Sequence, residues 1–283
     1  TLAKAGDNIV SVSQLYGGTY NFFAHSLPNQ GIEARMASGD DIDALEALID
    51  DNTKALFCES IGNPAGNIVD IQALSEMAHR HGVPVIVDNT VATPILCRPF
   101  EHGADIVIHS LTKYIGGHGT SVGGIIVDSG NFPWKDHPRF PAFNEPDPSY
   151  HGAVWTEAAK PLGPIAYILR ARVVLLRDLG ACMSPFNAFQ TIQGLETMPL
   201  RMERHCENGE KVAKYLAKHE KISHAIHPSL QDGEMKRRAD AYLSGGYGAL
   251  VGFELKGGKE AGMKFIDSLK MLYHVANIGD ARS

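Results

Sequence analysis

Short apolar runs rich in β-branched residues recur along the first half of the chain, and segments with helical periodicity separate them. Residues 83–87 are almost wholly apolar and lack the polar alternation of a strand that has one face in water. Strands of this kind are buried on both faces, and strands separated by helices are usually parallel, so the pattern predicts an α/β fold with a mostly parallel central sheet. The predicted strands are residues 8–13, 55–59, 83–87, 105–109 and 124–127, and the predicted helices among them are residues 41–49 and 70–81, the second with Asp70 as its N-cap.

A proline-rich segment interrupts this pattern at residues 131–152, where aromatic residues stand between the prolines. We interpret it as a long ordered loop, and loops of that length in compact domains are usually functional. A helix is predicted to follow at residues 164–179.

The last third of the chain predicts a second, smaller unit. Apolar residues at helical spacing over residues 195–216 indicate a connecting helix. One strand at residues 249–255 and one helix at residues 258–269 follow it. We therefore expect a large domain at residues 1–182 and a smaller C-terminal α+β domain at residues 183–283.

Composition and charge argue against several classes of function. Hydrophobic residues make up 44% of the chain and charged residues 20%, as in a globular protein with a sizeable core. The formal net charge is −6, and no cluster of Lys and Arg indicates a face for nucleic acid. No apolar run approaches the ~20 residues of a membrane span, and no signal peptide is visible. The four cysteines lack paired spacing, which favours reduced thiols in a cytoplasmic protein over a disulfide framework or a zinc site.

Polar residues gather where three of the predicted strands end. Glu59 and Ser60 stand at the end of one strand, Asp88 follows the most apolar strand, and Ser110 and Lys113 follow the next. Because ligands of parallel sheets bind beyond the carboxyl ends of the strands, we expect these segments to form one site.

Lys113 is the residue in this group that departs most from a solvated surface side chain. It follows a buried strand, has hydroxyl residues beside it and precedes a glycine-rich turn. Desolvation there would lower the pKa of its amine and favour imine chemistry. Asp88 has two interpretations, as the cap of the following turn or as a carboxylate that keeps the ring nitrogen of a bound heterocycle charged. Ser110 and Thr112 are either ordinary loop hydroxyls or phosphate ligands.

Tyr16 stands before two glycines that allow a close backbone turn after the first predicted strand. It is either a residue at the edge of the core or a ring that lies over a flat cofactor and offers its hydroxyl to the chemistry. The histidines His25, His109 and His118 are interpreted as packing or surface residues, since no metal-ligand spacing connects them.

In this order and spacing, these motifs resemble those of the pyridoxal-phosphate (PLP) enzymes of cysteine and methionine metabolism. That family has the aspartate-aminotransferase-like fold, fold type I, and the resemblance covers nearly the whole chain. The motifs that carry it are Tyr16-Gly17-Gly18-Thr19, Glu59-Ser60 with Asn63-Pro64, Val87-Asp88-Asn89-Thr90, Ser110-Leu111-Thr112-Lys113-Tyr114 with Gly117-His118, and Asn277 with Gly279-Asp280.

The resemblance implies a role for each matched position. Lys113 would carry the cofactor as a Schiff base and later move protons, and Asp88 would hold the ring nitrogen protonated. Tyr16 would stack on the ring and assist proton transfer. The remaining contacts would come from Asn63, to the phenolic oxygen, and from Ser110 and Thr112, to the phosphate.

Within the family, residues 60–64, 90–99 and 145–152 are similar to those of O-acetylhomoserine sulfhydrylases. That similarity implies a PLP-dependent transferase in methionine biosynthesis, which replaces the acetate of O-acetyl-L-homoserine with a sulfur nucleophile and gives homocysteine. Reactions of the cystathionine γ-synthase or methionine γ-lyase type are alternatives within the family. A phosphate- or nucleotide-binding α/β module without imine chemistry is the alternative from another class. The sulfur donor stays open between sulfide, a thiol and a sulfur-carrier protein, and the acyl group stays open between acetyl and succinyl.

The resemblance also implies parts that lie outside these residues. A glycine-containing phosphate loop and an N-terminal arm are expected before Thr1, and an arginine for the substrate carboxylate is expected after Ser283. The family further implies a homotetramer built from dimers with shared active sites, with small-molecule substrates and no nucleic-acid or membrane partner.

Overall fold

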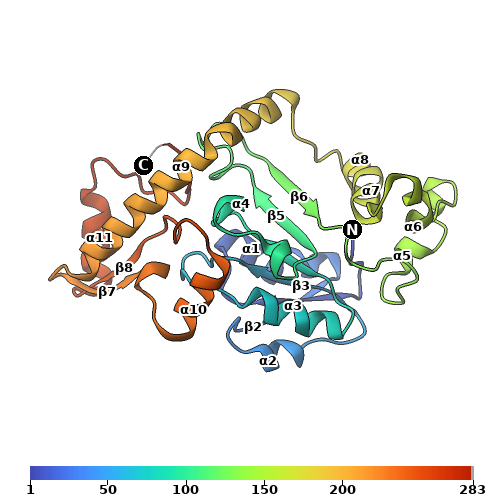
Figure 1. Cartoon of the computed structure of the whole chain (residues 1–283), viewed down its shortest axis with the longest axis horizontal. Coiled ribbons are helices and arrows are strands. Elements are labelled where there is room, and N and C mark those ends of the chain that lie inside the picture. The colour runs from blue at the N-terminus through green and yellow to red at the C-terminus, as the bar shows by residue number, and fades with distance from the viewer. Residues whose placement is uncertain (282–283) are drawn as a thin grey trace.

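The computed structural model describes residues 1–281 and centres on a six-stranded sheet (Figure 1). Four of its strand pairs are parallel, and β6 runs antiparallel to β5. The prediction of an α/β fold with a mostly parallel sheet is therefore confirmed. Across the sheet, the strands are β2 (Glu33–Ala37), β1 (Asn8–Val12), β3 (Thr53–Glu59), β4 (Val85–Asp88), β5 (Ile106–Ser110) and β6 (Gly124–Asp128).

The edge strand β2 was not predicted from the sequence. Its residues include Glu33 and Arg35, so it lacks the apolar run of the central strands. Charged side chains are common on edge strands, where they discourage pairing with other chains. Pairing with β1, and not local propensity, fixes β2 as a strand.

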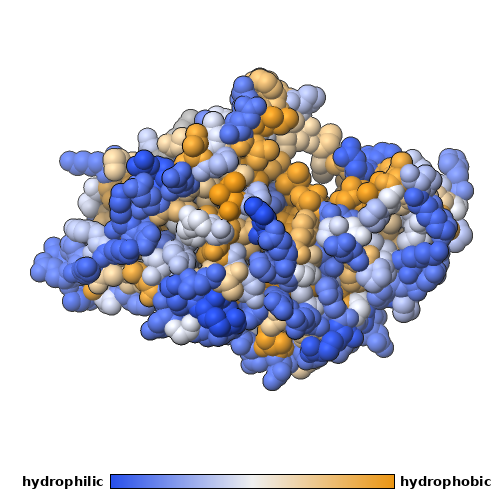
Figure 2. Space-filling model, viewed as in Figure 1, coloured by the Kyte–Doolittle hydropathy of each residue, from blue (hydrophilic) through white to orange (hydrophobic). Residues whose placement is uncertain are grey.

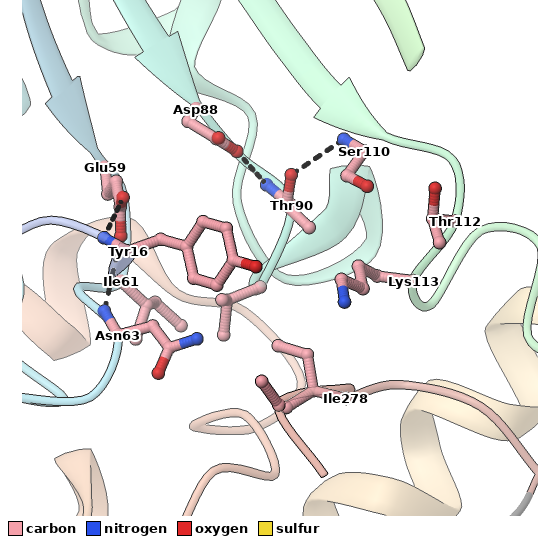
Figure 3. A pocket seen from close by; sticks show the side chains of 12 residues that line it. Tyr16, Glu59, Ile61, Asn63, Asp88, Thr90, Ser110, Thr112, Lys113 and Ile278 are labelled. Carbon is pink, nitrogen blue, oxygen red and sulfur yellow. Dashed lines mark hydrogen bonds between the residues drawn. The ribbon is translucent and has the colours of Figure 1, made fainter. Parts of the chain in front are cut away.

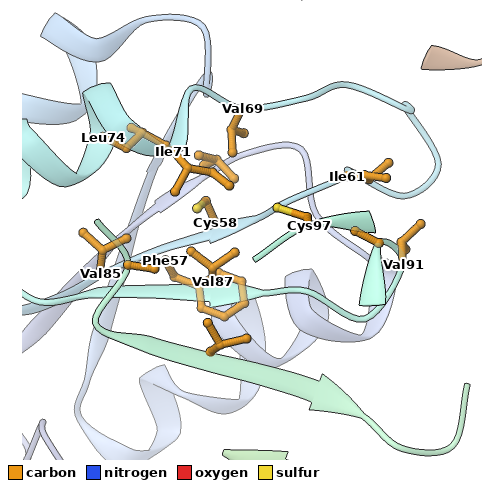
Figure 4. Packing of buried hydrophobic residues seen from close by; sticks show 14 of the residues in the cluster. Phe57, Cys58, Ile61, Val69, Ile71, Leu74, Val85, Val87, Val91 and Cys97 are labelled. Atoms are coloured by element: carbon orange, nitrogen blue, oxygen red, sulfur yellow. The ribbon is translucent and has the colours of Figure 1, made fainter. Parts of the chain in front are cut away.

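Helix α3 (Ile71–Arg80) shows how the sequence covers the central strands. The side chain of Asp70 accepts a hydrogen bond from the backbone N–H of Ala73 at 3.0 Å, which caps the helix as predicted. Leu74 and Met77 on its inner face are fully buried in the main core, part of which is drawn in Figure 4. Each such side chain stabilises the fold by about 1.5–3 kcal/mol. The shorter helices of this part are α1 (Gly17–Asn21), α2 (Ile42–Glu46) and α4 (Thr93–Leu96).

The proline-rich segment is an ordered loop with mostly irregular backbone, as predicted, and its aromatic residues form a second apolar core. Trp134 is buried and stacks on Phe143 at a centroid distance of 4.9 Å and on Tyr167 at 5.5 Å. The backbone turns repeatedly because the prolines interrupt regular hydrogen bonding, and aromatic packing then orders it. Helix α5 (Pro141–Asn144) lies in this segment, and α6 (Trp155–Ala158) follows it. The helix predicted at residues 164–179 is confirmed as one helical stretch of α7 (Ala166–Arg170), a π-helical part (Ala171–Leu176) and α8 (Arg177–Leu179).

The long helix α9 (Pro185–Ala217) runs between the central sheet and a two-stranded antiparallel sheet of β7 (Ile222–Ile226) and β8 (Gly252–Leu255) (Figure 1). It begins earlier than predicted because Ser184 caps it by accepting the backbone N–H of Asn187 at 3.2 Å. The other helices of this part are α10 (Gly233–Tyr242) and α11 (Gly258–Ser268).

The prediction of a single strand in this region was wrong, because β7 pairs with β8, and α10 was also missed. The division of the chain into domains at residues 182 and 183 stays a prediction. Within the described part of the chain, no helix is both long enough and apolar enough to cross a membrane.

An apolar surface lies over β5, β6 and the beginning of α9 (Figure 2). Ile125 and Ile126 of β6 are 45% and 48% exposed, although their strand is apolar. A cavity of about 710 Å³ lies between this strand pair and α9, and Leu111, Ile192 and Leu195 contribute to its lining. Its walls carry few polar groups, and Lys113, Asp88 and Tyr16 do not line it.

Candidate active site

A smaller cavity of about 260 Å³ lies at the carboxyl ends of β3, β4 and β5 (Figure 3). Each strand delivers its last residues to this edge because the three strands are parallel and adjacent. All six residues that the sequence predicted for a site contribute to the lining. The lining residues are Tyr16, Glu59, Ile61, Asn63, Asp88, Thr90, Val91, Ser110, Thr112, Lys113, Ala276 and Ile278.

Two carboxyl groups stand side by side at this edge. Glu59 ends β3 and Asp88 ends β4, and the two residues are register partners in the parallel pair. Burial raises the pKa of both groups, that of Glu59 to about 7, and the neighbouring Asp88 adds to the shift of Glu59. A cationic group bound beside them would therefore be stabilised electrostatically.

Glu59 binds the backbone on two sides of the cavity. Its Oε1 accepts the N–H of Tyr16 at 2.6 Å, and its Oε2 accepts the N–H of Asn63 at 3.3 Å. Figure 3 shows the Tyr16 ring extending into the middle of the cavity with its hydroxyl toward Lys113. The Asn63 side chain lies on the same side of the cavity as Tyr16 (Figure 3).

Asp88 is tied to the next strand through Thr90. Its Oδ1 accepts the backbone N–H of Thr90 at 2.9 Å, and the Thr90 hydroxyl oxygen accepts the N–H of Ser110 at 2.8 Å. Asp88 thus caps the turn after β4 and also lines the cavity, so its two interpretations from the sequence are compatible. These bonds hold the ends of β4 and β5 in a fixed relation.

Lys113 lies in the turn after β5, where it is partly buried. Its Nζ donates a hydrogen bond to Oδ1 of Asn277 at 2.5 Å. Burial lowers the pKa of the Lys113 amine, and Asp280 opposes that shift. The direction agrees with the prediction of a desolvated amine and favours its nucleophilic form.

The hydroxyl of Thr112 is engaged within the protein. It donates to the carbonyl of Gly123 at 3.3 Å and accepts the N–H of Gly123 at 3.1 Å. These bonds join the Lys113 turn to the start of β6. For Ser110, the backbone bond to Thr90 places the residue at the cavity.

Several residues of the cavity received no role from the sequence. Glu59 and Asn277 were recognised as parts of motifs, yet nothing in the sequence shows which groups they contact. Thr90 likewise received no role beyond its motif. The three histidines interpreted as packing or surface residues differ in exposure. His109 is buried, whereas His25 and His118 are exposed. His109 lines the apolar cavity and not this one.

The profile of the family described as Cys/Met metabolism PLP-dependent enzyme matches residues 1–283. The chain belongs to this family. This finding confirms the resemblance seen in the sequence motifs and the prediction of PLP as the cofactor.

Curated relatives agree with the family. A homocysteine synthase of Schizosaccharomyces pombe is 52% identical over the whole chain, which covers 66% of that protein. An O-acetyl-L-homoserine sulfhydrylase of Leptospira meyeri is 48% identical over the whole chain, which covers 65% of it. The chain thus spans slightly less than two thirds of the length of these relatives.

Solved structures show the same fold. A putative O-acetylhomoserine (thiol)-lyase of Campylobacter jejuni superposes with a TM-score of 0.94 at 40% identity, over 99% of this chain and 69% of that one. That structure contains a pyridoxyl-lysine phosphate. An O-acetylhomoserine sulfhydrylase of Wolinella succinogenes gives a TM-score of 0.84 at 36% identity, over 99% of this chain and 76% of that one. The fold is therefore PLP fold type I, as predicted.

The residues around the cavity fit pyridoxal phosphate. An amine, a partly buried carboxyl group and an aromatic ring converge there from Lys113, Asp88 and Tyr16. They match the three features of the cofactor that need protein partners, which are its aldehyde, its pyridine nitrogen and its flat ring. The Asn63 amide and the Ser110 hydroxyl add polar groups for its oxygens.

Proposed function

We propose that the protein replaces the acetate of O-acetyl-L-homoserine with a sulfur nucleophile and produces homocysteine in methionine biosynthesis. The observation that carries the proposal is the convergence of Lys113, Asp88 and Tyr16 at one cavity. The names of the relatives, homocysteine synthase and O-acetyl-L-homoserine sulfhydrylase, support the choice of substrate.

In this proposal, Lys113 holds the cofactor and moves protons. Bound PLP supplies an electron sink for negative charge that develops on the substrate carbons. The Lys113 amine would accept a proton from Cα of the substrate and give it up within the site before it accepts a second proton from Cβ, and it would return protons to the product carbons at the end. Its lowered pKa increases the fraction of amine that can accept a proton near neutrality.

Asp88 and Tyr16 orient and stabilise the cofactor. The Asp88 carboxylate would hold a protonated pyridine nitrogen, because burial strengthens the attraction between opposite charges. The Tyr16 ring would lie against the cofactor ring, and its hydroxyl is directed toward the amine of Lys113 (Figure 3). Asn63 would donate to the phenolic oxygen, and Ser110 and Thr112 would contact the phosphate.

The net reaction joins two substrates and releases one acid. The Cγ–O bond of O-acetyl-L-homoserine breaks and acetate leaves with its electron pair. A sulfur nucleophile such as hydrogen sulfide forms the new bond to that carbon. The products are homocysteine and acetate, and no external oxidant or reductant is needed.

Two measurements test the proposal on the full chain. Sodium borohydride reduction in the presence of PLP should attach the cofactor covalently to Lys113, which peptide mass spectrometry would locate. Incubation with O-acetyl-L-homoserine and sulfide should then yield homocysteine. Formation of an α-keto acid and a thiol from methionine alone would favour the methionine γ-lyase type of reaction instead.

Paired lysine variants control for the role of the amine. Lys113→Ala should lose both the adduct and the turnover. Lys264→Ala changes an exposed lysine of α11 and should keep both. A Lys113→Ala protein that still makes homocysteine at a near-normal rate would refute the role of Lys113.

We further propose that the protein is a cytoplasmic homotetramer built from dimers with shared active sites. Family membership supports this proposal. The partner subunit would then contribute further contacts to each site.

A further inference from the structure

We propose that Glu59 is a positioning residue that holds the Tyr16 and Asn63 walls of the cavity at the separation required by the cofactor ring. The inference rests on the proposed function, because Tyr16 and Asn63 are its cofactor contacts. Glu59 itself would act through the backbone of these two residues.

The geometry of a single carboxyl group carries the argument. Oε1 of Glu59 accepts from Tyr16 and Oε2 accepts from Asn63, so the two oxygens bind different segments. Tyr16 precedes α1, and Asn63 lies in the loop after β3. These segments lie far apart in the sequence, and Glu59 joins them at the cavity.

The surroundings of Glu59 are unfavourable for a charge that has no function. The residue is 4% exposed, and its register partner is Asp88, a second acidic residue. A buried carboxylate is costly unless it receives hydrogen bonds, and here it receives two from the backbone. Burial and the adjacent Asp88 raise the pKa of Glu59, which shows that its charged form is disfavoured at this position. A neutral residue would avoid that electrostatic cost, so we infer that the acid is kept for its two hydrogen bonds.

An amide cannot make the same pair of bonds. In Glu59→Gln, one carboxyl oxygen becomes an NH₂ group, which would face a backbone N–H that also donates. Only Tyr16 or Asn63 could then keep its bond. We expect the other segment to shift and its side chain to lose its position in the cavity.

The test measures PLP binding to the full chain by a titration of visible absorbance and circular dichroism. Glu59→Gln should weaken PLP binding by about tenfold or more and reduce the induced circular dichroism of the bound cofactor, which reports its asymmetric surroundings. The matched control is Asp41→Asn, an acid-to-amide change at a carboxylate that accepts the N–H of Ala44 at 2.9 Å away from the cavity. That control should bind PLP as the wild type does.

A double-mutant cycle separates positioning from a general loss of stability. If Glu59 acts through Asn63, then Asn63→Ala should weaken binding less in the Glu59→Gln background than in the wild type. Because the amide could keep either bond, the same cycle is run with Tyr16→Ala, and effects that multiply in both double variants would overturn the inference. So would a Glu59→Gln protein with wild-type binding and an unchanged circular dichroism spectrum.

Glu59→Asp provides a second variant in case the amide prevents folding. It keeps the charge and both acceptors but shortens the reach, so it should also weaken binding and change the spectrum. Wild-type behaviour of Glu59→Asp would overturn the inference as well. A wild-type protein that fails to bind PLP would refute the proposed function and the inference together, whereas normal variants of a PLP-binding wild type would refute only the inference.

Discussion

The amine of Lys113 donates a hydrogen bond to the side-chain oxygen of Asn277 at 2.5 Å, although the two residues are 164 positions apart. The amide of Asn277 is oriented from its other end, where Nδ2 donates to Oδ2 of Asp280 at 2.6 Å. The segment after α11 therefore reaches the turn after β5 and contributes to the surroundings of the lysine. Ala276 and Ile278, which flank Asn277, line the same cavity.

Asn277→Asp should raise the pKa of the Lys113 amine, because a carboxylate would replace a neutral oxygen beside a group that can carry positive charge. The pH profile of PLP attachment to Lys113, followed by borohydride trapping, should move upward by about 1 unit or more. Asn131→Asp adds the same charge at an exposed position and should leave the profile in place. A profile for Asn277→Asp that coincides with that of the wild type would show that this hydrogen bond has no influence on the amine.

Glu59 should make the stability of the cofactor-free protein depend on pH. Its pKa is raised from 4.5 to about 7, so the folded state binds more protons than the unfolded state between these values. Relative to high pH, protonation of Glu59 therefore increases the free energy of unfolding. This contribution is fully present below pH 4.5 and is lost as the pH rises through about 7. The full effect is on the order of 3 kcal/mol.

Urea unfolding of wild type and Glu59→Gln at several pH values measures this difference. The wild type should lose stability relative to the variant between about pH 4.5 and pH 7. Glu76→Gln, an exposed acid-to-amide substitution on α3, controls for the substitution itself. A constant gap between wild type and Glu59→Gln would contradict the raised pKa.

The sequence predicted the groups of the site better than their connections. Lys113 and Asp88 could be predicted because each follows an apolar run, and the carboxyl ends of parallel strands meet at one edge of a sheet. The role of Glu59 could not be predicted, since it depends on register and on backbone groups that have no sequence signal. The bond between Lys113 and Asn277 needs the full course of the chain and is equally invisible locally.

The fold shows the same difference between local and distant determinants. Helix α3 could be predicted because its cap, Asp70, and its apolar face lie within one short segment. Strand β2 and the aromatic core around Trp134 depend on partners elsewhere in the chain, so local patterns did not reveal them. Tertiary pairing and packing override local propensity at such places.

The pair of His79 and Asp105 should stabilise the fold more at low pH than at high pH. Nε2 of His79 lies 2.8 Å from Oδ2 of Asp105, and this hydrogen bond raises the pKa of His79 above 6.5. The contribution of the ion pair is therefore full below pH 6.5 and is lost as the pH rises through the raised value. Because the His79 side chain is 40% exposed, solvent screening limits the size of the effect.

Thermal unfolding of wild type and His79→Gln tests this pair. The variant should be less stable at pH 6, and the difference should shrink at pH 9. A difference for His79→Gln that grows with pH would contradict the sign of the shift.

Two glycines in helices give opposite predictions for the same substitution. A Cβ atom at Gly194 in α9 would lie 2.2 Å from the carbonyl oxygen of Gly116 and 2.6 Å from that of Ile115, in the turn that follows Lys113. Gly194→Ala should therefore destabilise the protein by about 1–3 kcal/mol and disturb the position of Lys113. A Cβ atom at Gly262 in α11 meets no atom within 4 Å, so Gly262→Ala should stabilise its helix by up to about 1 kcal/mol. Urea unfolding measures both effects, and borohydride trapping measures PLP attachment, which should fall only for Gly194→Ala. Equal stability and equal attachment in the two variants would show that α9 does not support the Lys113 turn.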